Sequence, residues 1–327
     1  MRVFWGLGDV PGGFGPSAVA VGKFDGVHRG HQEIVRRLVV HARERAVRSV
    51  VVTFDRNPLE VLRPESCPEE VMPLSRRCEL LEDAGVEAVL ILRFTREFAA
   101  QAPEVFIDEV LLNALGARVV LAGEDFRFGF RGAGDLSLLE RRGAVEGFDV
   151  EAVPPVVVDG QVVSSTRIRR ALAEGEVRHA SALLGRPPEV SGVVVHGAKR
   201  GRELGFPTAN LGEAVVSGRR IPVAGLIPAD GVYAGWAVPL ADAGGCEAGD
   251  RLPAAISVGT NPTFSEVPRT VEAHILDRRL NLYGCPMRVE FVDFLRPMVA
   301  FSSREDLIAG MREDVARCRD VLVRIAQ

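Results

Sequence analysis

The feature that most constrains the fold is a change of pattern near residue 186. Before it, short apolar runs alternate with segments in which apolar residues recur every three to four positions. After it, one β pattern follows another, separated by Gly, Pro and Asp, until a last helical pattern begins near Ser302. At about 150 residues per domain, 327 residues also suit two domains. We therefore predict one domain at residues 1–185 and a second at residues 186–327.

The first half is predicted to be a doubly wound α/β domain. Its apolar runs lie between helical patterns and Gly-rich turns. Strands joined by helices in this way form a parallel sheet, and ligands bind beyond the carboxyl ends of its strands. The expected strands are residues 17–24, 49–54, 86–92, 118–123 and 149–158, and the expected helices include 75–85, which Ser75 would cap, 103–115 and 164–175.

The second half is predicted to be a small antiparallel β-barrel closed by a C-terminal helix. Its β patterns are short, as in VSGVVVHG, GVYAGWAV, LPAAISVG, RTVEAHIL and MRVEFVDFL. The final helix is expected to start at a capping box formed by Ser302 and Glu305. Its apolar stripe is expected to pack against the barrel rather than to bind a partner.

Composition narrows the class of protein. Lys and Arg number 40 and Asp and Glu number 44, a net charge of −4 that argues against a general nucleic-acid binder. The apolar runs are shorter than the roughly 18 residues of a membrane span. Five scattered cysteines without a CxxC pair suggest neither disulfides nor a zinc site. We expect a soluble cytoplasmic protein, and nothing in the sequence specifies an oligomeric state.

The segment GKFDGVHRGHQ, residues 22–32, is the first candidate site. His28 and His31 lie three residues apart between a predicted strand and a predicted helix. Glycines allow close approach to the backbone, and a helix N-terminus offers free N–H groups to an anion. This pattern favours phosphate binding over a polar turn with exposed histidines. A metal-binding histidine pair is less favoured, because no Cys or carboxylate lies at ligand spacing beside it.

Two further segments are expected at the same sheet edge. In VSSTRIRR, Ser164 and Thr166 offer hydroxyls at a helix start and Arg169 adds charge. Taken alone, these residues favour simple capping and solvated charge, and phosphate binding is suggested only because the segment shares a sheet edge with His28. In GEDFRFGFRGAGD, Phe126 and Phe128 could stack on a flat ring or could anchor a glycine loop.

The second half carries its own candidate residues. In KRGRELGFPTAN, Thr208 and Asn210 are hard oxygen donors that suit Mg²⁺ carrying nucleotide phosphates, although a basic surface loop is the alternative. Three cations, Lys199, Arg200 and Arg202, lie close by in the sequence.

The segment RTVEAHILD, residues 269–277, holds a candidate general base. On a strand, Val271, Ala273 and Ile275 would share one face, so Glu272 and His274 would share the other. A carboxylate there can take a proton from a reacting group, or it can be a cross-strand ion-pair partner.

Together these motifs resemble those of the bacterial bifunctional riboflavin kinase/FAD synthetase family, in the same order and along nearly the whole chain. GKFDGVHRGH, GEDFRFG and VSSTRIR resemble the family's N-terminal signature. GRELGFPTAN, GVYAG, ISVGTNPTF, VEAHILD and LYG resemble its kinase signature. The resemblance implies a nucleotidyltransferase-like FMN adenylyltransferase at residues 1–185 and a riboflavin kinase at residues 186–327. The substrates would be riboflavin, FMN and ATP with Mg²⁺, and no nucleic acid or membrane is implied.

The resemblance also implies roles for particular residues. The base that takes the riboflavin 5′-hydroxyl proton would be Glu272, and the flavin would lie near Phe126 and Phe128. In the first domain the ATP-binding residues would be Gly22, Phe24, His28, His31, Ser164, Thr166 and Arg169, with both histidines catalytic. In the second domain Gly205, Thr208 and Asn210 would bind ATP, the last two as the Mg²⁺ ligands.

The chain departs from the family pattern at two places. Arg56-Asn57-Pro58 stands where the family commonly shows Pro-His-Pro, and Ala300 stands where a charged residue is frequent. The first departure leaves the role of that loop open but not the chemistry, because His28 and His31 remain, and the second implies only a small loss of local polar contacts. Three functions stay open: both activities, only the kinase activity, or none, as a flavin or nucleotide sensor. Products formed from riboflavin, ATP and Mg²⁺ distinguish the three: FAD, FMN alone, or unchanged riboflavin.

Overall fold

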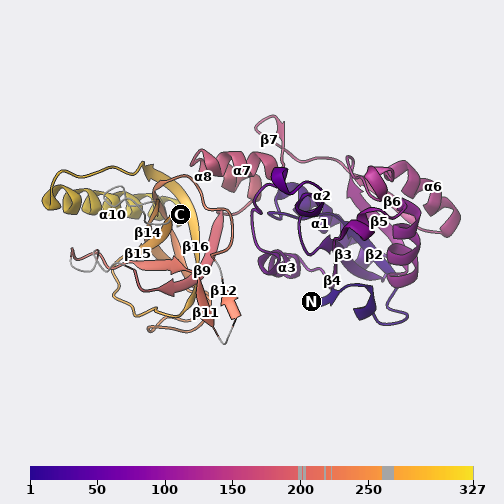
Figure 1. Cartoon of the computed structure of the whole chain (residues 1–327), viewed down its shortest axis with the longest axis horizontal. Coiled ribbons are helices and arrows are strands. Elements are labelled where there is room, and N and C mark those ends of the chain that lie inside the picture. The colour runs from indigo at the N-terminus through magenta and orange to yellow at the C-terminus, as the bar shows by residue number, and fades with distance from the viewer. Residues whose placement is uncertain (198–200, 202–203, 217–218, 222, 260–268, 327) are drawn as a thin grey trace. The chain divides into compact units, whose positions relative to one another are not determined.

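The computed structural model describes the whole chain except residues 198–200, 202–203, 217–218, 222, 260–268 and 327 (Figure 1). The chain forms two compact units, Met1–Ser165 and Thr166–Gln327. None of the helices in the described residues is both long and apolar enough to cross a membrane. All five cysteines lie in the described part of the chain, as free thiols.

The first unit is built on a six-stranded parallel sheet, which confirms the predicted doubly wound fold. Its strand order is β1-β4-β3-β2-β5-β6. After β2 the chain adds β3 and β4 on one side of that strand, and then β5 and β6 on the other side. The four-residue edge strand β1 was not expected from the sequence. The strands are β1 (Arg2–Trp5), β2 (Ser17–Val21), β3 (Arg48–Phe54), β4 (Ala88–Leu92), β5 (Ala117–Gly123) and β6 (Asp149–Val153).

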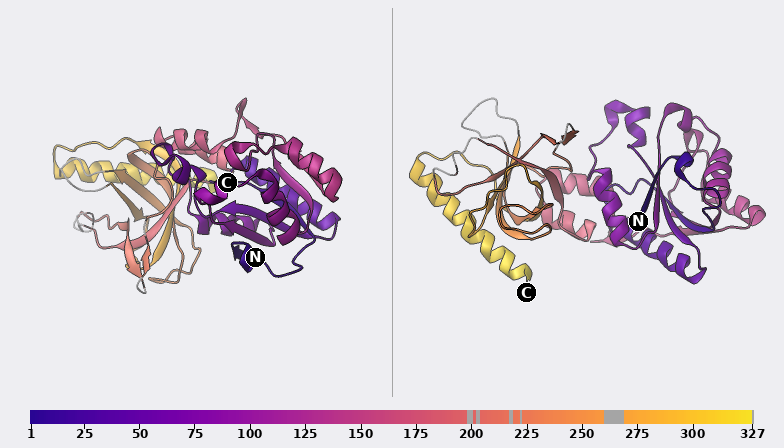
Figure 2. Two further views of the ribbon diagram at one scale, coloured as in Figure 1. Left: turned by 45° about the vertical axis from the view of Figure 1, so that its right-hand side comes forward. Right: turned by 90° about the horizontal axis from the view of Figure 1, so that it is seen from below.

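Helices cover both faces of this sheet (Figure 2). On one face Val35, Leu38 and Leu81 pack against the strands, and on the other Ile107 and Leu139 do so. The helical segments are α1 (Arg29–Glu44), α2 (Pro58–Leu62), α3 (Leu74–Asp83), α4 (Arg96–Ala99), α5 (Pro103–Val105), the π-helix η3 (Phe106–Ala114) and α6 (Leu136–Glu146), with short 3₁₀ turns at η1 (Leu7–Asp9), η2 (Pro64–Ser66) and η4 (Phe130–Gly132).

Some local expectations were wrong. Ser75 does not cap α3, which begins one residue earlier with Pro73 at the N-cap position. The expected strand 149–158 is split into β6 and the short β7 (Val157–Val158), which pairs with β8 (Gln161–Val162) as a separate hairpin. The break falls at Pro154 and Pro155, because proline has no N–H to donate to a neighbouring strand.

The second unit contains the predicted barrel. In its described residues six strands close in the order β10-β15-β14-β13-β16-β9, all antiparallel. The strands are β9 (Glu189–Val195), β10 (Ala209–Gly212), β13 (Gly231–Pro239), β14 (Leu252–Gly259), β15 (Thr270–Ile275) and β16 (Pro286–Arg296), and a separate hairpin pairs β11 (Ala214–Val216) with β12 (Arg219–Ile221).

The C-terminal helix α10 (Arg304–Ala326) packs on β13, β14 and β16. Its buried residues include Cys318 and Leu322, as expected for a core stripe. The expected capping box at Ser302 is wrong by one position. Ser303 Oγ accepts the hydrogen bond from Asp306 N, at 3.0 Å.

Helix α8 (Val177–Leu184) packs on β16 of the barrel, and α7 (Ser165–Ala173) precedes it in the chain. Arg178 forms an ion pair of 2.6 Å with Asp293 of β16, and Ala229 N donates to Leu172 O at 2.8 Å. For this reason the compact units divide after Ser165, about twenty residues before the change of sequence pattern. A functional boundary at residues 185 and 186 stays a prediction.

Candidate active sites

The turn between β2 and α1 occupies the point where the sheet's strand order reverses. The chain runs from β2 to β3 on one side, while β5 flanks β2 on the other. In parallel sheets this is where ligands bind. The turn has an unusual backbone, with positive φ at Phe24 (51°), Gly26 (86°) and Val27 (38°). The predicted phosphate-binding segment therefore lies at the expected edge of the sheet.

His28 and His31 are brought together at the start of α1. His28 Nδ1 accepts a hydrogen bond from His31 N at 3.4 Å, so His28 is the N-cap of the helix. In a neutral ring that accepts through Nδ1, the proton is on Nε2, which can then donate to an anion. The two rings stack with centroids 3.7 Å apart and planes 14° apart. A Cβ at Gly30 would lie 3.2 Å from the His28 ring, so glycine permits this arrangement.

The Phe24 ring lies buried beneath the turn, next to Gly22. The Phe24 side chain is fully buried, with its ring centroid 5.1 Å from that of His31. A Cβ at Gly22 would lie 3.1 Å from the Phe24 ring. With its side chain buried, Phe24 can offer a ligand its backbone but not its ring.

The loop after β5 carries the two predicted flavin-binding rings. Phe126 and Phe128 stack with centroids 5.4 Å apart. Phe128 is only 9% exposed and packs against Phe106 in the core, and a Cβ at Gly134 would clash with it. Phe128 therefore anchors the glycine loop, as the simpler interpretation expected, while Phe126 is partly exposed. A flavin contact by either ring stays a prediction.

Ser165, the residue after Ser164, links this segment to the turn between β2 and α1. Ser165 Oγ donates to the backbone oxygen of Asp25 at 2.9 Å, across 140 residues of sequence. The Asp25 carboxylate is buried and accepts from Val71 N at 2.9 Å. Asp25 was not among the predicted site residues, although the pair Asp25-Gly26 is a turn signal. Thr166 and Arg169 lie on α7 in the second unit, and their approach to ATP stays a prediction.

The loop that departs from the family pattern starts a helix. Asn57 is the N-cap of α2, and its Oδ1 accepts from Leu59 N at 3.1 Å, with Pro58 in the first turn. Arg56 forms an ion pair of 3.1 Å with Asp55. A pocket at the carboxyl ends of β2 and β3 is lined by Lys23, Asp25, Phe54, Arg56, Asn57, Glu70 and Arg77.

In the barrel, Thr208, Asn210 and Glu272 form one hydrogen-bonded cluster. Thr208 Oγ1 donates to Glu272 Oε2 at 3.0 Å. With its amide nitrogen toward Glu272, Asn210 donates to both carboxylate oxygens at 3.1 and 3.2 Å, and its oxygen lies 3.2 Å from Thr208 Oγ1. Asn210 lies on β10 opposite Glu272 on β15. The structure thus joins residues that sequence analysis took from two separate motifs.

Strand β15 aims the carboxylate away from the core. Val271 and Ala273 are buried, whereas Glu272 and His274 are partly exposed on the other face, which confirms the predicted alternation. His274 Nδ1 lies 2.8 Å from Pro207 O and holds the segment before β10. Gly205, in the turn before Thr208, has a φ of +89° that favours glycine.

A pocket opens beside Thr208. Its wall is mostly apolar, with one guanidinium and one phenol ring, and its lining residues are Val194, Pro207, Thr208, Ala209, Ala273, Ile275, Arg278, Leu280, Leu282 and Tyr283. Outside the described residues lie the predicted cations Lys199, Arg200 and Arg202, together with residues 260–264 of the segment ISVGTNPTF. In the described part of the chain no three or more His, Cys, Asp or Glu residues gather as a metal site, so hydroxyl and amide oxygens are the available donors beside Glu272.

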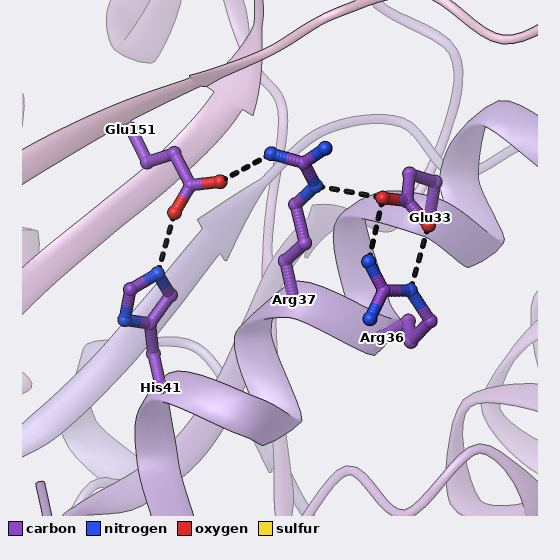
Figure 3. Close-up of polar contacts among 5 residues, drawn as sticks. All are labelled: Glu33, Arg36, Arg37, His41 and Glu151. Carbon is purple, nitrogen blue, oxygen red and sulfur yellow. Dashed lines mark hydrogen bonds and ion pairs between the residues drawn. The ribbon is translucent and has the colours of Figure 1, made fainter. Parts of the chain in front are cut away.

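An ion-pair network fixes the body of α1 to β6 (Figure 3). Glu151 of β6 pairs with Arg37 at 2.7 Å and with His41 at 2.5 Å. Glu33 accepts from both Arg36 and Arg37. These hydrogen bonds lower the pKa of Glu33 to about 2. The network holds the helix whose N-terminus carries the two histidines.

Comparison with known proteins covers both units. Residues 14–167 match the family model described as FAD synthetase, and residues 184–322 match the one described as riboflavin kinase. An Escherichia coli K12 protein named bifunctional riboflavin kinase/FMN adenylyltransferase is 34% identical over 302 residues, which cover 92% of this chain and 91% of that protein. A Pseudomonas fluorescens protein of the same name is 36% identical over 302 residues, 91% of each chain. A crystal structure described as a macrolide-efflux protein from Streptococcus pneumoniae has a TM-score of 0.82 at 31% identity, covering 98% of this chain and 99% of that one.

Proposed function

The chain belongs to the family of bifunctional riboflavin kinase/FMN adenylyltransferases, and we propose that it makes FMN from riboflavin and then FAD from FMN, with one ATP for each step. The observation that carries this proposal is the match of separate stretches of one chain to both family models. The hydrogen-bonded cluster in the barrel and the stacked histidines beside β2 support the assignment of residues to each step.

In the kinase step the γ-phosphoryl group of ATP moves to the 5′-hydroxyl oxygen of riboflavin, and ADP leaves. The hydroxyl proton passes to the carboxylate of Glu272. The hydrogen bonds from Thr208 and Asn210 hold that carboxylate in one orientation. Phosphoryl transfer depends mainly on positioning and charge stabilisation, so one oriented base is sufficient protein chemistry.

A divalent cation fits the barrel cluster. The Thr208 hydroxyl, the Asn210 amide oxygen and the neighbouring Glu272 carboxylate are hard oxygen donors, which Mg²⁺ prefers. We therefore assign Thr208 and Asn210 as the residues that hold Mg²⁺ with ATP. Gly205 supports them, because its positive φ lets the turn approach the nucleotide. When bound, the cation neutralises charge on the phosphates.

In the adenylyl step a phosphate oxygen of FMN attacks the α-phosphorus of ATP, and pyrophosphate leaves. Because the FMN phosphate is the nucleophile, no covalent enzyme intermediate is required. His28 and His31 donate to the ATP phosphates and stabilise the charge of the transition state. Gly22 and Phe24 contribute backbone to the ATP site, and Ser164, Thr166 and Arg169 are the partners proposed for it.

The flavin of the adenylyl step is proposed to lie near Phe126 and Phe128. Phe126 is the ring available for contact, since it is partly exposed, and Phe128 supports it from the core. The proposed partners are small molecules, with neither nucleic acid nor membrane among them. We place the enzyme in the cytoplasm, which suits its free cysteines.

The experiment that tests the proposal is chromatography of the flavins formed from riboflavin, ATP and Mg²⁺. FMN should appear first and FAD should follow. FMN without FAD, even when FMN is supplied, would limit the function to the kinase. Unchanged riboflavin together with unchanged supplied FMN would contradict both activities and favour a sensor.

A further inference from the structure

Arg77 of α3 is a buried arginine that holds the turn of the two histidines. It is 3% exposed, and its Nη1 donates to Lys23 O at 2.8 Å, across 54 residues of sequence. Thr53 Oγ1, from β3, donates to the same oxygen at 3.2 Å. Arg77 Nη2 donates to Glu70 Oε1 at 3.2 Å. Side chains from two separate elements therefore fix the carbonyl that precedes Phe24.

The Lys23 carbonyl directly precedes the part of the turn in which non-glycine residues have positive φ. Phe24 and Val27 have positive φ although neither is glycine, and Val27 is β-branched. Such conformations persist only where surrounding contacts fix them, and they concentrate at functional sites. Val27 N donates to Phe24 O at 3.0 Å, and Gln32 donates to Val27 O at 2.8 Å, so the turn is continuous with the start of α1.

Burial of this guanidinium is costly. Among the described residues Arg77 Nε has no hydrogen-bond partner. The partner carboxyl is also partly desolvated, and burial raises the pKa of Glu70 although Arg77 opposes this. An apolar side chain of similar size would avoid the cost of a buried charge. The cost of burying this charge is explained by the hydrogen bond to Lys23 O, which an apolar residue cannot make.

We propose that Arg77 is a positioning residue for the adenylyl step. It fixes Lys23 O and, through the turn, the placement of His28 and His31, without contacting substrate itself. The inference rests on the proposed function of this site. The inference adds to the proposed adenylyl site a residue that neither the histidine motif nor the Arg56-Asn57-Pro58 loop indicated.

The test uses the full chain with one control and three substitutions at Arg77 and Thr53, the two residues that donate to Lys23 O. Arg77→Met removes both hydrogen bonds, Arg77→Lys keeps the charge with a smaller donor, and Thr53→Val removes the second donor to Lys23 O with little change of shape. Arg142→Met is the matched control, because Arg142 pairs with Asp108 and Glu146 of the same unit. We would measure kcat and KM for ATP in FAD formation from FMN, FMN formation from riboflavin, and hydrogen exchange of residues 22–32.

Arg77→Met is expected to lower kcat/KM for FAD formation on the order of 10- to 100-fold, the usual effect of misplaced catalytic groups. FMN formation should be unchanged, and exchange of residues 22–32 should rise. Arg77→Lys should recover part of the loss, and Thr53→Val should show a smaller loss of the same kind. Arg142→Met should reduce thermal stability while kcat/KM stays at the wild-type value.

Wild-type kcat/KM and wild-type exchange in both Arg77→Lys and Thr53→Val would overturn the inference, even if Arg77→Met failed to fold. A loss confined to thermal stability would overturn it as well. If the wild-type chain forms no FAD, the proposed function fails instead. The exchange of residues 22–32 then decides separately whether Arg77 holds the turn, and unchanged exchange overturns that claim.

Discussion

Asn210 and Glu272 are register partners on neighbouring antiparallel strands, and the Asn210 amide donates to both oxygens of the Glu272 carboxylate. The Asn210 side chain thus sets the orientation of the proposed base, and its amide oxygen lies 3.2 Å from Thr208 Oγ1. The arrangement makes the kinase step sensitive to small changes on β10 as well as to changes of Glu272 itself.

Replacing the proposed base should separate the two activities. Glu272→Gln keeps the size and much of the hydrogen bonding but cannot take a proton. FMN formation should fall about 10²- to 10⁴-fold, the contribution of a general base. FAD formation from supplied FMN should stay at the wild-type rate. Chromatography of both reactions measures the split, and loss of both activities in a folded variant would contradict separate sites.

Replacing a histidine should give the opposite result. His31→Ala removes the imidazole that stacks on His28 at 3.7 Å. FAD formation from FMN should fall on the order of 10²- to 10³-fold, because a donor to transition-state charge is lost. Riboflavin phosphorylation by the same chain is the internal control. Equal loss of both reactions, with unchanged circular dichroism, would refute the assignment of His31 to the adenylyl step.

Gly197 provides a test of the Asn210 position. A Cβ added at Gly197 would lie 2.6 Å from Asn210 Cγ and 2.5 and 2.8 Å from the two terminal atoms of its amide. Gly197→Ala should therefore displace the amide from Glu272 and lower kcat for FMN formation about tenfold, as expected for a lost positioning contact. The rate of FAD formation should be unaffected. An unchanged kcat would mean that Asn210 does not orient the base.

The Glu33 network predicts a pH dependence of stability. The pKa of Glu33 is lowered from 4.5 to about 2 by Arg36 and Arg37, so folding favours its charged form. This contribution is fully present above about pH 4.5 and is lost as the pH falls toward 2. Its size should be on the order of 1 kcal/mol, because solvent screens a partly exposed pair.

Urea unfolding between pH 2 and pH 7 measures this contribution. Glu33→Gln should flatten the fall in the free energy of unfolding at low pH by that amount. Glu44→Gln, a change of an exposed glutamate on the same helix, should leave the wild-type slope. Equal slopes in wild type and Glu33→Gln would show that the network does not stabilise the folded state.

The amino-acid sequence alone determined the class of each half and the identity of most strands. Apolar alternation with a period of two was enough to place Glu272 and His274 on one face of a strand, because side-chain direction along a strand is a local property. The position of His28 and His31 between a strand and a helix was equally predictable. The unpredicted β1 is too short for a clear periodic signal.

Tertiary structure alone decided which distant residues meet. Thr208 and Glu272 are 64 residues apart, and Arg77 reaches Lys23 across 54, so their contacts depend on how the chain packs. Pairing of β10 with β15 puts Asn210 opposite Glu272, and burial against Phe106 makes Phe128 an anchor. Periodicity specifies which face of an element is buried, but the neighbour and register of that element follow from long-range packing, which no local pattern encodes.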